Sequence, residues 1–141
     1  MIEISDQDKF NADQVIIDLL ASFLAINGVS VATGFSIAKR LFESQIVCID
    51  KDSNSIRFTD EHEIFSAIVG SSYPRGHYVS RLVASRVFRS FSQINSQGGL
   101  AFLCSLTEAS VSDVRSKLLP LYGVGEKFVS TYSLLAGIME Y

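Results

Sequence analysis

The chain has 141 residues and a mass of 15.5 kDa, which is the length of one domain of ordinary size. Apolar residues make up 48% of the sequence and charged residues 19%, so the chain can fill a core and is too hydrophobic for intrinsic disorder. Its two cysteines exclude a disulfide scaffold and favour a reducing compartment, which predicts a cytoplasmic protein. Four side chains could supply zinc ligands, but none has the usual ligand spacing, and we expect no metal or other cofactor: Cys48, His62, His77 and Cys104.

The net charge of −3 is unevenly distributed along the chain. Residues 1–63 carry a net charge of −6, whereas residues 64–141 carry +3. No acidic residue lies between Glu63 and Glu108, and four arginines fall in that interval: Arg75, Arg81, Arg86 and Arg89. Such a basic stretch can bind a polyanion locally even though the whole chain is acidic.

Neither the start of the sequence nor its longest uncharged run predicts a targeting or membrane segment. The first ten residues are acidic, unlike a signal or transit peptide. Residues 19–38 carry no charge and are long enough to span a bilayer. However, Asn27-Gly28 in the middle of the run is a strong turn signal, so the run is predicted to form two packed helices.

Apolar spacing and turn residues predict the elements of the first half of the chain. They are a helix from Ala12 to Ile26 capped by Asn11, a helix from Ser30 to Glu43, a hairpin of Ile46–Ile49 and Ser55–Phe58, and a short helix from Thr59 or Asp60 to Val69. The second helix is expected to bury Val31, Phe35, Ala38 and Phe42. Asp50 to Glu61 resembles a calcium-binding EF-hand loop, but Ser55 replaces the glycine that such a loop needs, so a polar hairpin turn is favoured.

The second half is predicted to be wholly helical. A long helix from Gly76 to Gln93 buries Val79, Leu82, Val83, Val87 and Phe91, with Arg81, Ser85 and Arg89 on its opposite face. A short helix from Leu100 to Leu106, a helix from a capping box at Ser110 to Leu119, and a last helix from near Gly125 to the C-terminus complete the chain. The sequence therefore predicts one all-α domain over residues 1–141, with one small β-hairpin near residues 46–58.

A glycine bend precedes the last helix, in the segment Leu121-Tyr122-Gly123-Val124-Gly125-Glu126-Lys127. The two glycines allow a sharp turn, and Val124 between them can fix the turn to the core. Because the second glycine opens a helix, unpaired backbone N–H groups and the positive end of the helix dipole are expected to face outward. This arrangement can bind a phosphate without a base-specific side chain.

The segment resembles the helix-hairpin-helix DNA-binding motif over about residues 110–139. More narrowly, Gly123-Val124-Gly125-Glu126-Lys127 is similar to the Gly-Val-Gly-x-Lys of the helix-hairpin-helix DNA glycosylase superfamily, the endonuclease III and 8-oxoguanine glycosylase group. The resemblance implies contacts from Gly123, Val124, Gly125 and Lys127 to the duplex backbone. We expect Arg75, Arg81 and Arg89 to extend this DNA-binding surface.

In the bifunctional members of that superfamily, the lysine at the position of Lys127 is the nucleophile that forms a Schiff base with the sugar. Their catalytic aspartate follows the lysine by a little under twenty residues, whereas this sequence has only fourteen residues after Lys127. Tyr122 also replaces the usual proline before the first glycine. The resemblance therefore implies an incomplete catalytic set, in which an acid such as Glu126, Asp113 or one from a second subunit would have to complete the chemistry.

Three other interpretations of the sequence remain open. The chain could be a helical interaction module that binds a protein partner or a second copy of itself. It could also be a winged-helix regulator, with Ser30–Glu43 as recognition helix and Ile46–Phe58 as wing, although that helix offers only Lys39 and Arg40 as cations. Aromatic and cationic residues at the start of the long helix, Tyr73, Arg75, His77 and Tyr78, could stack on unpaired bases or could cap a loop with one buried tyrosine.

Overall fold

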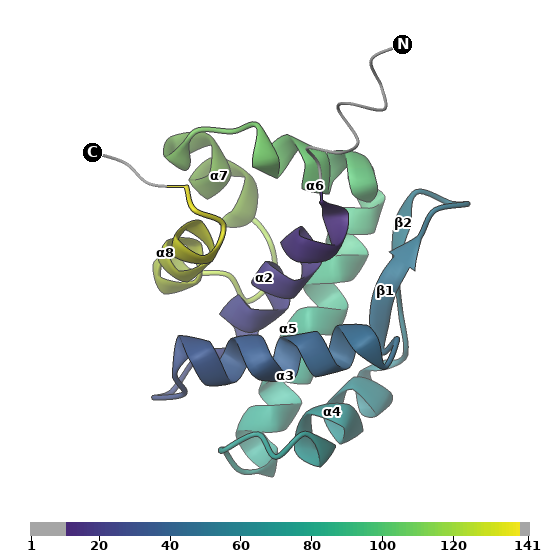
Figure 1. Cartoon of the computed structure of the whole chain (residues 1–141), viewed down its shortest axis with the longest axis vertical. Helices are drawn as coiled ribbons and strands as arrows, with labels where there is room; N and C mark the ends of the chain where they lie inside the picture. The colour runs from purple at the N-terminus through teal and green to yellow at the C-terminus, as the bar shows by residue number, and fades with distance from the viewer. Residues whose placement is uncertain (1–10, 139–141) are drawn as a thin grey trace.

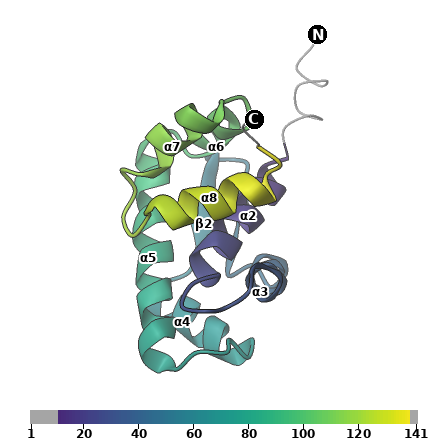
Figure 2. The ribbon, with the colours of Figure 1, turned by 90° about the vertical axis from the view of Figure 1, so that its left-hand side faces the viewer.

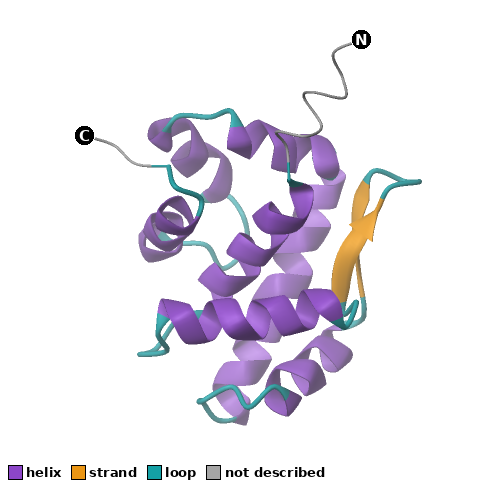
Figure 3. Ribbon diagram, viewed as in Figure 1, coloured by secondary structure: helices purple, strands orange, loops and turns teal. Residues whose placement is uncertain are grey.

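The computed structural model describes residues 11–138 and confirms a mainly helical fold with one small hairpin (Figures 1 and 3). Its helices are α2 (Ala12–Leu24), α3 (Val31–Glu43), α4 (Glu61–Gly70), α5 (His77–Ser96), α6 (Leu100–Thr107), α7 (Val111–Leu118) and α8 (Glu126–Leu135). Strands β1 (Val47–Asp50) and β2 (Ser55–Phe58) form the antiparallel hairpin, in the register Val47 to Phe58 and Asp50 to Ser55.

Helix α2 is the centre of the core. Every residue from Val15 to Leu24 is buried, because this helix is apolar on nearly all of its faces. It packs against α3, α5, α6 and α8, and Figure 2 shows α8 crossing in front of it. Phe23 on α2 contacts Phe91 of α5 and Phe128 of α8, with ring centroids 6.4 and 4.5 Å away. The last helix is thereby fixed to the core through its first turn.

The uncharged run of the sequence divides as predicted at Asn27-Gly28, and both residues have positive φ angles of 52° and 86°. The chain turns there and α3 packs closely on α2. Within residues 11–138, no helix is both long and apolar enough to cross a membrane.

The predicted buried face of α3 is confirmed for Ala38 and wrong for the other three residues. The structure buries Gly34, Ile37, Ala38 and Leu41, whereas Val31, Phe35 and Phe42 are half-buried. The cause is a close crossing with α2 at Gly34. A Cβ atom there would lie 3.0 Å from the carbonyl oxygen of Ala21, so a larger residue would push the two backbones apart. The helix is therefore rotated to place its small residues against α2, with its phenylalanines at the edges of the contact.

Four helices begin with the side-chain caps that short polar residues provide, on α2, α3, α4 and α7. The caps are Asn11, Ser30, Asp60 and Ser110. The other three described helices, α5, α6 and α8, begin after Gly76, Gly99 and Gly125, with no side-chain cap. Without a side-chain cap, the first N–H groups of these three helices need an acceptor from another part of the molecule or from a ligand.

The hairpin packs on α5 through Phe58, which contacts Phe88 and Phe91, and Asn95 of α5 forms hydrogen bonds with its second strand. The side chain of Asn95 accepts a hydrogen bond from the Ile56 N–H (2.9 Å) and donates one to the Ile56 carbonyl (2.8 Å). At the tip of the hairpin, the Asp50 carboxylate accepts from the N–H of Asp52 at 3.0 Å, which closes a polar turn. Across residues 11–138, no cluster of three His, Cys, Asp or Glu side chains is placed to hold a metal ion.

The C-terminal ends of α5 and α8 differ from the predictions. Helix α5 continues to Ser96, three residues beyond the predicted end, and Val79 and Leu82 on its predicted buried face are half-buried. Helix α8 ends at Leu135 instead of continuing, because Gly137 adopts a φ of +73° and the Ile138 N–H donates to the Ser133 carbonyl at 2.8 Å. The last three residues of the predicted helix, 139–141, fall outside the described residues.

Candidate functional site

Residues 119–125 connect α7 to α8 in a bend that lies against α5. Gly123 takes a φ of +77°, a conformation that favours glycine. Leu121 is buried and Val124 is half-buried against the core, as the sequence predicted for Val124. The Tyr122 N–H donates to Oε1 of Gln93 on α5 at 2.6 Å. Two apolar anchors and one hydrogen bond therefore hold the bend in place beside the long helix.

The first turn of α8 exposes backbone donors. Gly125 has an extended backbone with no side chain to cap the helix, and Gly125, Glu126 and Lys127 are all exposed. The N–H groups of Glu126, Lys127 and Phe128 have no hydrogen-bond acceptor among the described residues. Unpaired N–H groups at a helix start carry partial positive charge and attract anions. The sequence predicted this feature of the bend, and the structure has it.

Arg86 is a component of the site that the sequence counted in the basic stretch but did not place in the predicted DNA-binding set. Its aliphatic stem lies directly over Gly123, where an added Cβ atom would be 2.5 Å from Cγ of Arg86. The signal that could have found it is helical spacing, because Arg86, Arg89 and Gln93 follow one another at i, i+3 and i+7 on one face of α5. That face packs on the bend, so its cations are brought to the start of α8.

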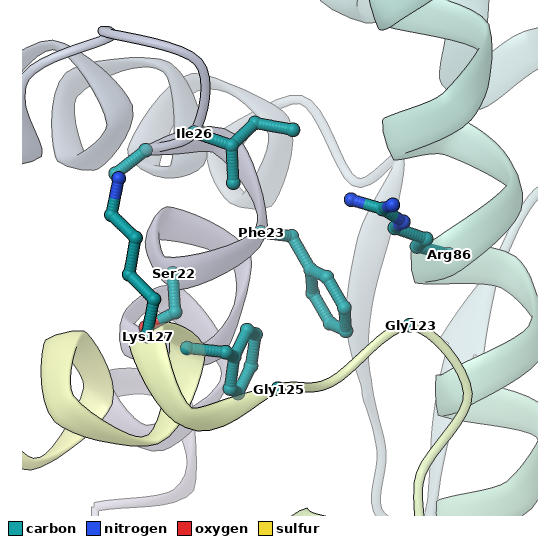
Figure 4. A pocket seen from close by; sticks show the side chains of 9 residues that line it. Ser22, Phe23, Ile26, Arg86, Gly123, Gly125 and Lys127 are labelled. Atoms are coloured by element: carbon teal, nitrogen blue, oxygen red, sulfur yellow. The ribbon is translucent and has the colours of Figure 1, made fainter.

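A small cavity lies between the bend, α2 and α5 (Figure 4). Its volume is about 160 Å³. Phe23, Ile26 and Phe128 provide an apolar part of its wall, and Arg86 and Lys127 extend their charged side chains from opposite sides. The backbones of Gly123 and Gly125 border it as well. The site is thus a recess with an aromatic wall and two cationic sides.

The other predicted cations are divided between the bend and more distant positions. The guanidinium of Arg89 lies over the ring of Tyr122, 4.8 Å from its centroid. Arg89 therefore lies beside the bend, and it is exposed. Arg81 instead lies over the ring of Phe65 on α4, at 4.2 Å. Arg75 donates to the carbonyl of Asn27 at 2.6 Å and to that of Pro74 at 2.7 Å. The structure therefore places Arg89 beside Tyr122 in the bend and Lys127 just after it in α8, whereas Arg75 and Arg81 lie elsewhere.

The acidic residue next to Lys127 is already paired. Arg115 on α7 binds the carboxylate of Glu126 through two hydrogen bonds, one of them 3.0 Å from Nε to Oε1. The bonds to Arg115 lower the pKa of the Glu126 carboxyl below its usual value. Both side chains are exposed, so the pair contributes little stability, but it directs the carboxylate toward α7.

In the loop before α5, the structure matches the interpretation of a capped loop with one buried tyrosine. Tyr73 is buried and its hydroxyl donates to the Leu24 carbonyl at 2.7 Å, while burial raises the pKa of Tyr73 to about 12. Its ring is therefore inaccessible to a base. His77 lies edge-on to Phe65 at 5.6 Å, and Tyr78 is 81% exposed. On α3, Arg40 donates to the Ser71 carbonyl at 3.4 Å.

Comparisons of the chain with protein-family models, with curated proteins and with solved structures found no match. The candidate site therefore has to be interpreted from its own residues.

Proposed function

We propose that this protein binds DNA by holding the phosphate backbone at the start of α8. The observation that carries the proposal is the uncapped first turn of α8, where exposed N–H groups lie beside the cations Arg86, Arg89 and Lys127. Backbone amides and cations together recognise phosphate in any sequence context. The expected binding is therefore dependent on salt and only weakly dependent on base sequence.

A relationship to the helix-hairpin-helix DNA glycosylases is part of the proposal. It is supported by the Gly123-Val124-Gly125-Glu126-Lys127 segment and by its position between two helices, α7 and α8. For catalysis, however, the site lacks two requirements of a lysine nucleophile. Lys127 is exposed instead of enclosed in an apolar pocket, and no carboxylate lines the cavity beside it. A backbone binder without complete glycosylase chemistry fits these residues best.

A salt titration of binding to a short duplex tests the proposed function. Three cations at the bend predict that the logarithm of the association constant falls with the logarithm of salt concentration, with a slope of about −3. The same slope is expected for duplexes of unrelated sequence. Absence of binding at low salt would contradict the proposal and would leave the helical protein-interaction module as the better interpretation.

Borohydride trapping on a duplex with an abasic site tests the enzymatic part. We expect no covalent adduct that depends on Lys127, because the nucleophile is exposed and its neighbouring carboxylate is paired with Arg115. The matched control is Lys127→Ala. An adduct with the unchanged protein that disappears in this variant would show that the chain is a lyase.

A further inference from the structure

The cavity beside the bend is a recess, and binding of a continuous DNA backbone does not require one. It is a recess of about 160 Å³, well below the roughly 300 Å³ at which pockets for drug-sized ligands begin. Phe23 in the last turn of α2 and Ile26, two residues after that helix ends, form one side of it. A recess of this size can accept a small group at the end of a chain, whereas a continuous backbone passes along a surface.

Two cations from different helices line this recess. Arg86 comes from α5 and Lys127 from α8, and the close-up shows them on opposite sides of the aromatic wall (Figure 4). Neither forms an ion pair with an acid in residues 11–138, where the one ion pair joins Arg115 to Glu126. No acidic side chain lines the recess. Two positive charges that line one recess without an anion indicate a ligand with more than one negative charge.

The position of Arg86 is fixed by the bend. Its stem covers Gly123, which has no side chain to displace it, so the guanidinium is directed past the glycine into the recess. Fixing the stem in this way reduces the conformational entropy that a flexible side chain loses when it binds a ligand. The planar guanidinium also presents several N–H donors in the geometry that suits phosphate oxygens.

We infer that the recess binds a terminal phosphomonoester of a DNA strand, at an end or at a nick. A phosphodiester inside a strand carries one negative charge, whereas a phosphomonoester carries between about 1.5 and 2 at neutral pH. Arg86 and Lys127 match the second group in charge, and the size of the recess suits a group that ends a chain. This inference rests on the proposed function, because it adds a preference for strand ends to the binding of the backbone.

Binding to four otherwise identical duplexes tests the inference. One is intact, and three carry a nick with a 5′-phosphate, with a 3′-phosphate, or with two hydroxyls. We expect one phosphorylated nick to bind about tenfold more tightly than the hydroxyl nick, which corresponds to about 1.4 kcal/mol. The comparison between 5′ and 3′ shows which end the recess accepts. Equal affinities for all three nicked duplexes would overturn the inference.

Matched variants locate the effect. Arg86→Met keeps the aliphatic stem over Gly123 and removes the charge, so the preference for the phosphorylated nick should disappear while the thermal midpoint is retained. Lys127→Met should have the same effect. Arg89→Met is the control, because Arg89 lies over Tyr122 outside the recess, and it should weaken binding to all four duplexes equally. A full preference in Arg86→Met would overturn the inference.

The two proposals fail in different ways. If the intact duplex binds and nicks are not distinguished, the proposed function stands and the terminal phosphate inference is wrong. If only a phosphorylated nick binds, the recess is supported and the proposed binding of a continuous backbone is wrong.

Discussion

Helices α5 and α8 begin in the same way, yet only one of them forms a candidate site. Each follows a glycine with an extended backbone, Gly76 or Gly125, and neither glycine provides a cap. An added Cβ atom would meet nothing within 4 Å at either position. By local geometry alone, both helix starts offer unpaired N–H groups to an anion.

The difference lies in the neighbouring cations. Beside the start of α5, the guanidinium of Arg75 is already bound to the carbonyls of Asn27 and Pro74. Beside the start of α8, Arg86 and Lys127 line a recess and have no acidic partner in the described part of the chain. A helix start therefore becomes a candidate anion site through its tertiary neighbours, which come from other segments of the chain.

The largest expected effect comes from removing the two exposed cations along the bend, Arg89 of α5 and Lys127 of α8. Arg89→Met combined with Lys127→Met should weaken duplex binding about 100-fold, since each charge-assisted contact is worth roughly 1.4 kcal/mol. The slope of the salt titration should fall by about 2. The charge-matched control is Lys39→Met with Arg40→Met on α3. If that pair abolished binding instead, the recognition surface would be the winged-helix face.

The next largest effect concerns the bend itself. Gly123→Ala places a side chain at a φ of +77° and against the stem of Arg86, so the free energy of unfolding should fall by about 2 kcal/mol. Gly76→Ala, at a φ of −72° in open space, should change it by less than about 0.5 kcal/mol. Urea denaturation measures both. Equal stability of the two variants would show that the bend is not held as described.

A side-chain cap tests the comparison directly. Gly125→Asp supplies an acceptor for the exposed N–H groups and a negative charge at the start of α8, so it should weaken duplex binding about tenfold. The same cap should stabilise the fold by a few tenths of a kcal/mol. Gly76→Asp should give the same gain in stability at α5 with no change in binding. Equal losses of affinity in both variants would indicate a general effect of charge.

The smallest expected effect concerns Asp18 on α2. It tests whether the stability of the core that α2 forms with α8 can change without a change in binding at the site. Asp18 is buried on α2, and desolvation raises the pKa of its carboxyl, although a hydrogen bond from Gln14 at 2.8 Å partly opposes this. Because the folded state holds the proton more tightly, stability is lost as pH rises from the ordinary value of 3.8 through the raised value.

Asp18→Asn removes this dependence. The variant should be more stable at pH 7 by on the order of 1 kcal/mol, with a gain that shrinks toward acid pH, and it should bind DNA unchanged. Urea denaturation between pH 3.5 and 7 gives the comparison. A gain that does not depend on pH would show that ionisation of Asp18 is not its source.

Local signals in the sequence predicted most of the helices and the form of the bend. Asn11, Ser30 and Ser110 identified helix starts because a short polar cap acts within one turn, and the structure has these caps. Gly123 and Gly125 identified the bend for the same reason, since a turn conformation and a missing cap are local properties. The mainly helical class followed from apolar spacing along each segment.

Contacts between distant segments could not be predicted in this way. The close approach at Gly34 rotates α3, and an apolar pattern gives no weight to a glycine. The position of Arg86 depends on the contact of its stem with Gly123, which lies 37 residues away in the sequence. Arg81 was grouped with Arg89 by helical spacing and Arg75 by charge, although an aromatic ring holds Arg81 elsewhere and two carbonyls hold Arg75.

The bonds from Asn95 to Ile56 have a consequence for the order of folding. A two-stranded hairpin is marginally stable by itself. Here the amide side chain of Asn95 forms two hydrogen bonds with the backbone of Ile56 at the edge of the hairpin, as a neighbouring strand would. We therefore expect strands β1 and β2 to become stable only once the C-terminal turns of α5 are in place. In hydrogen exchange, the Ile56 amide should open together with α5, which makes this peripheral hairpin a reporter of whether the helical core has assembled.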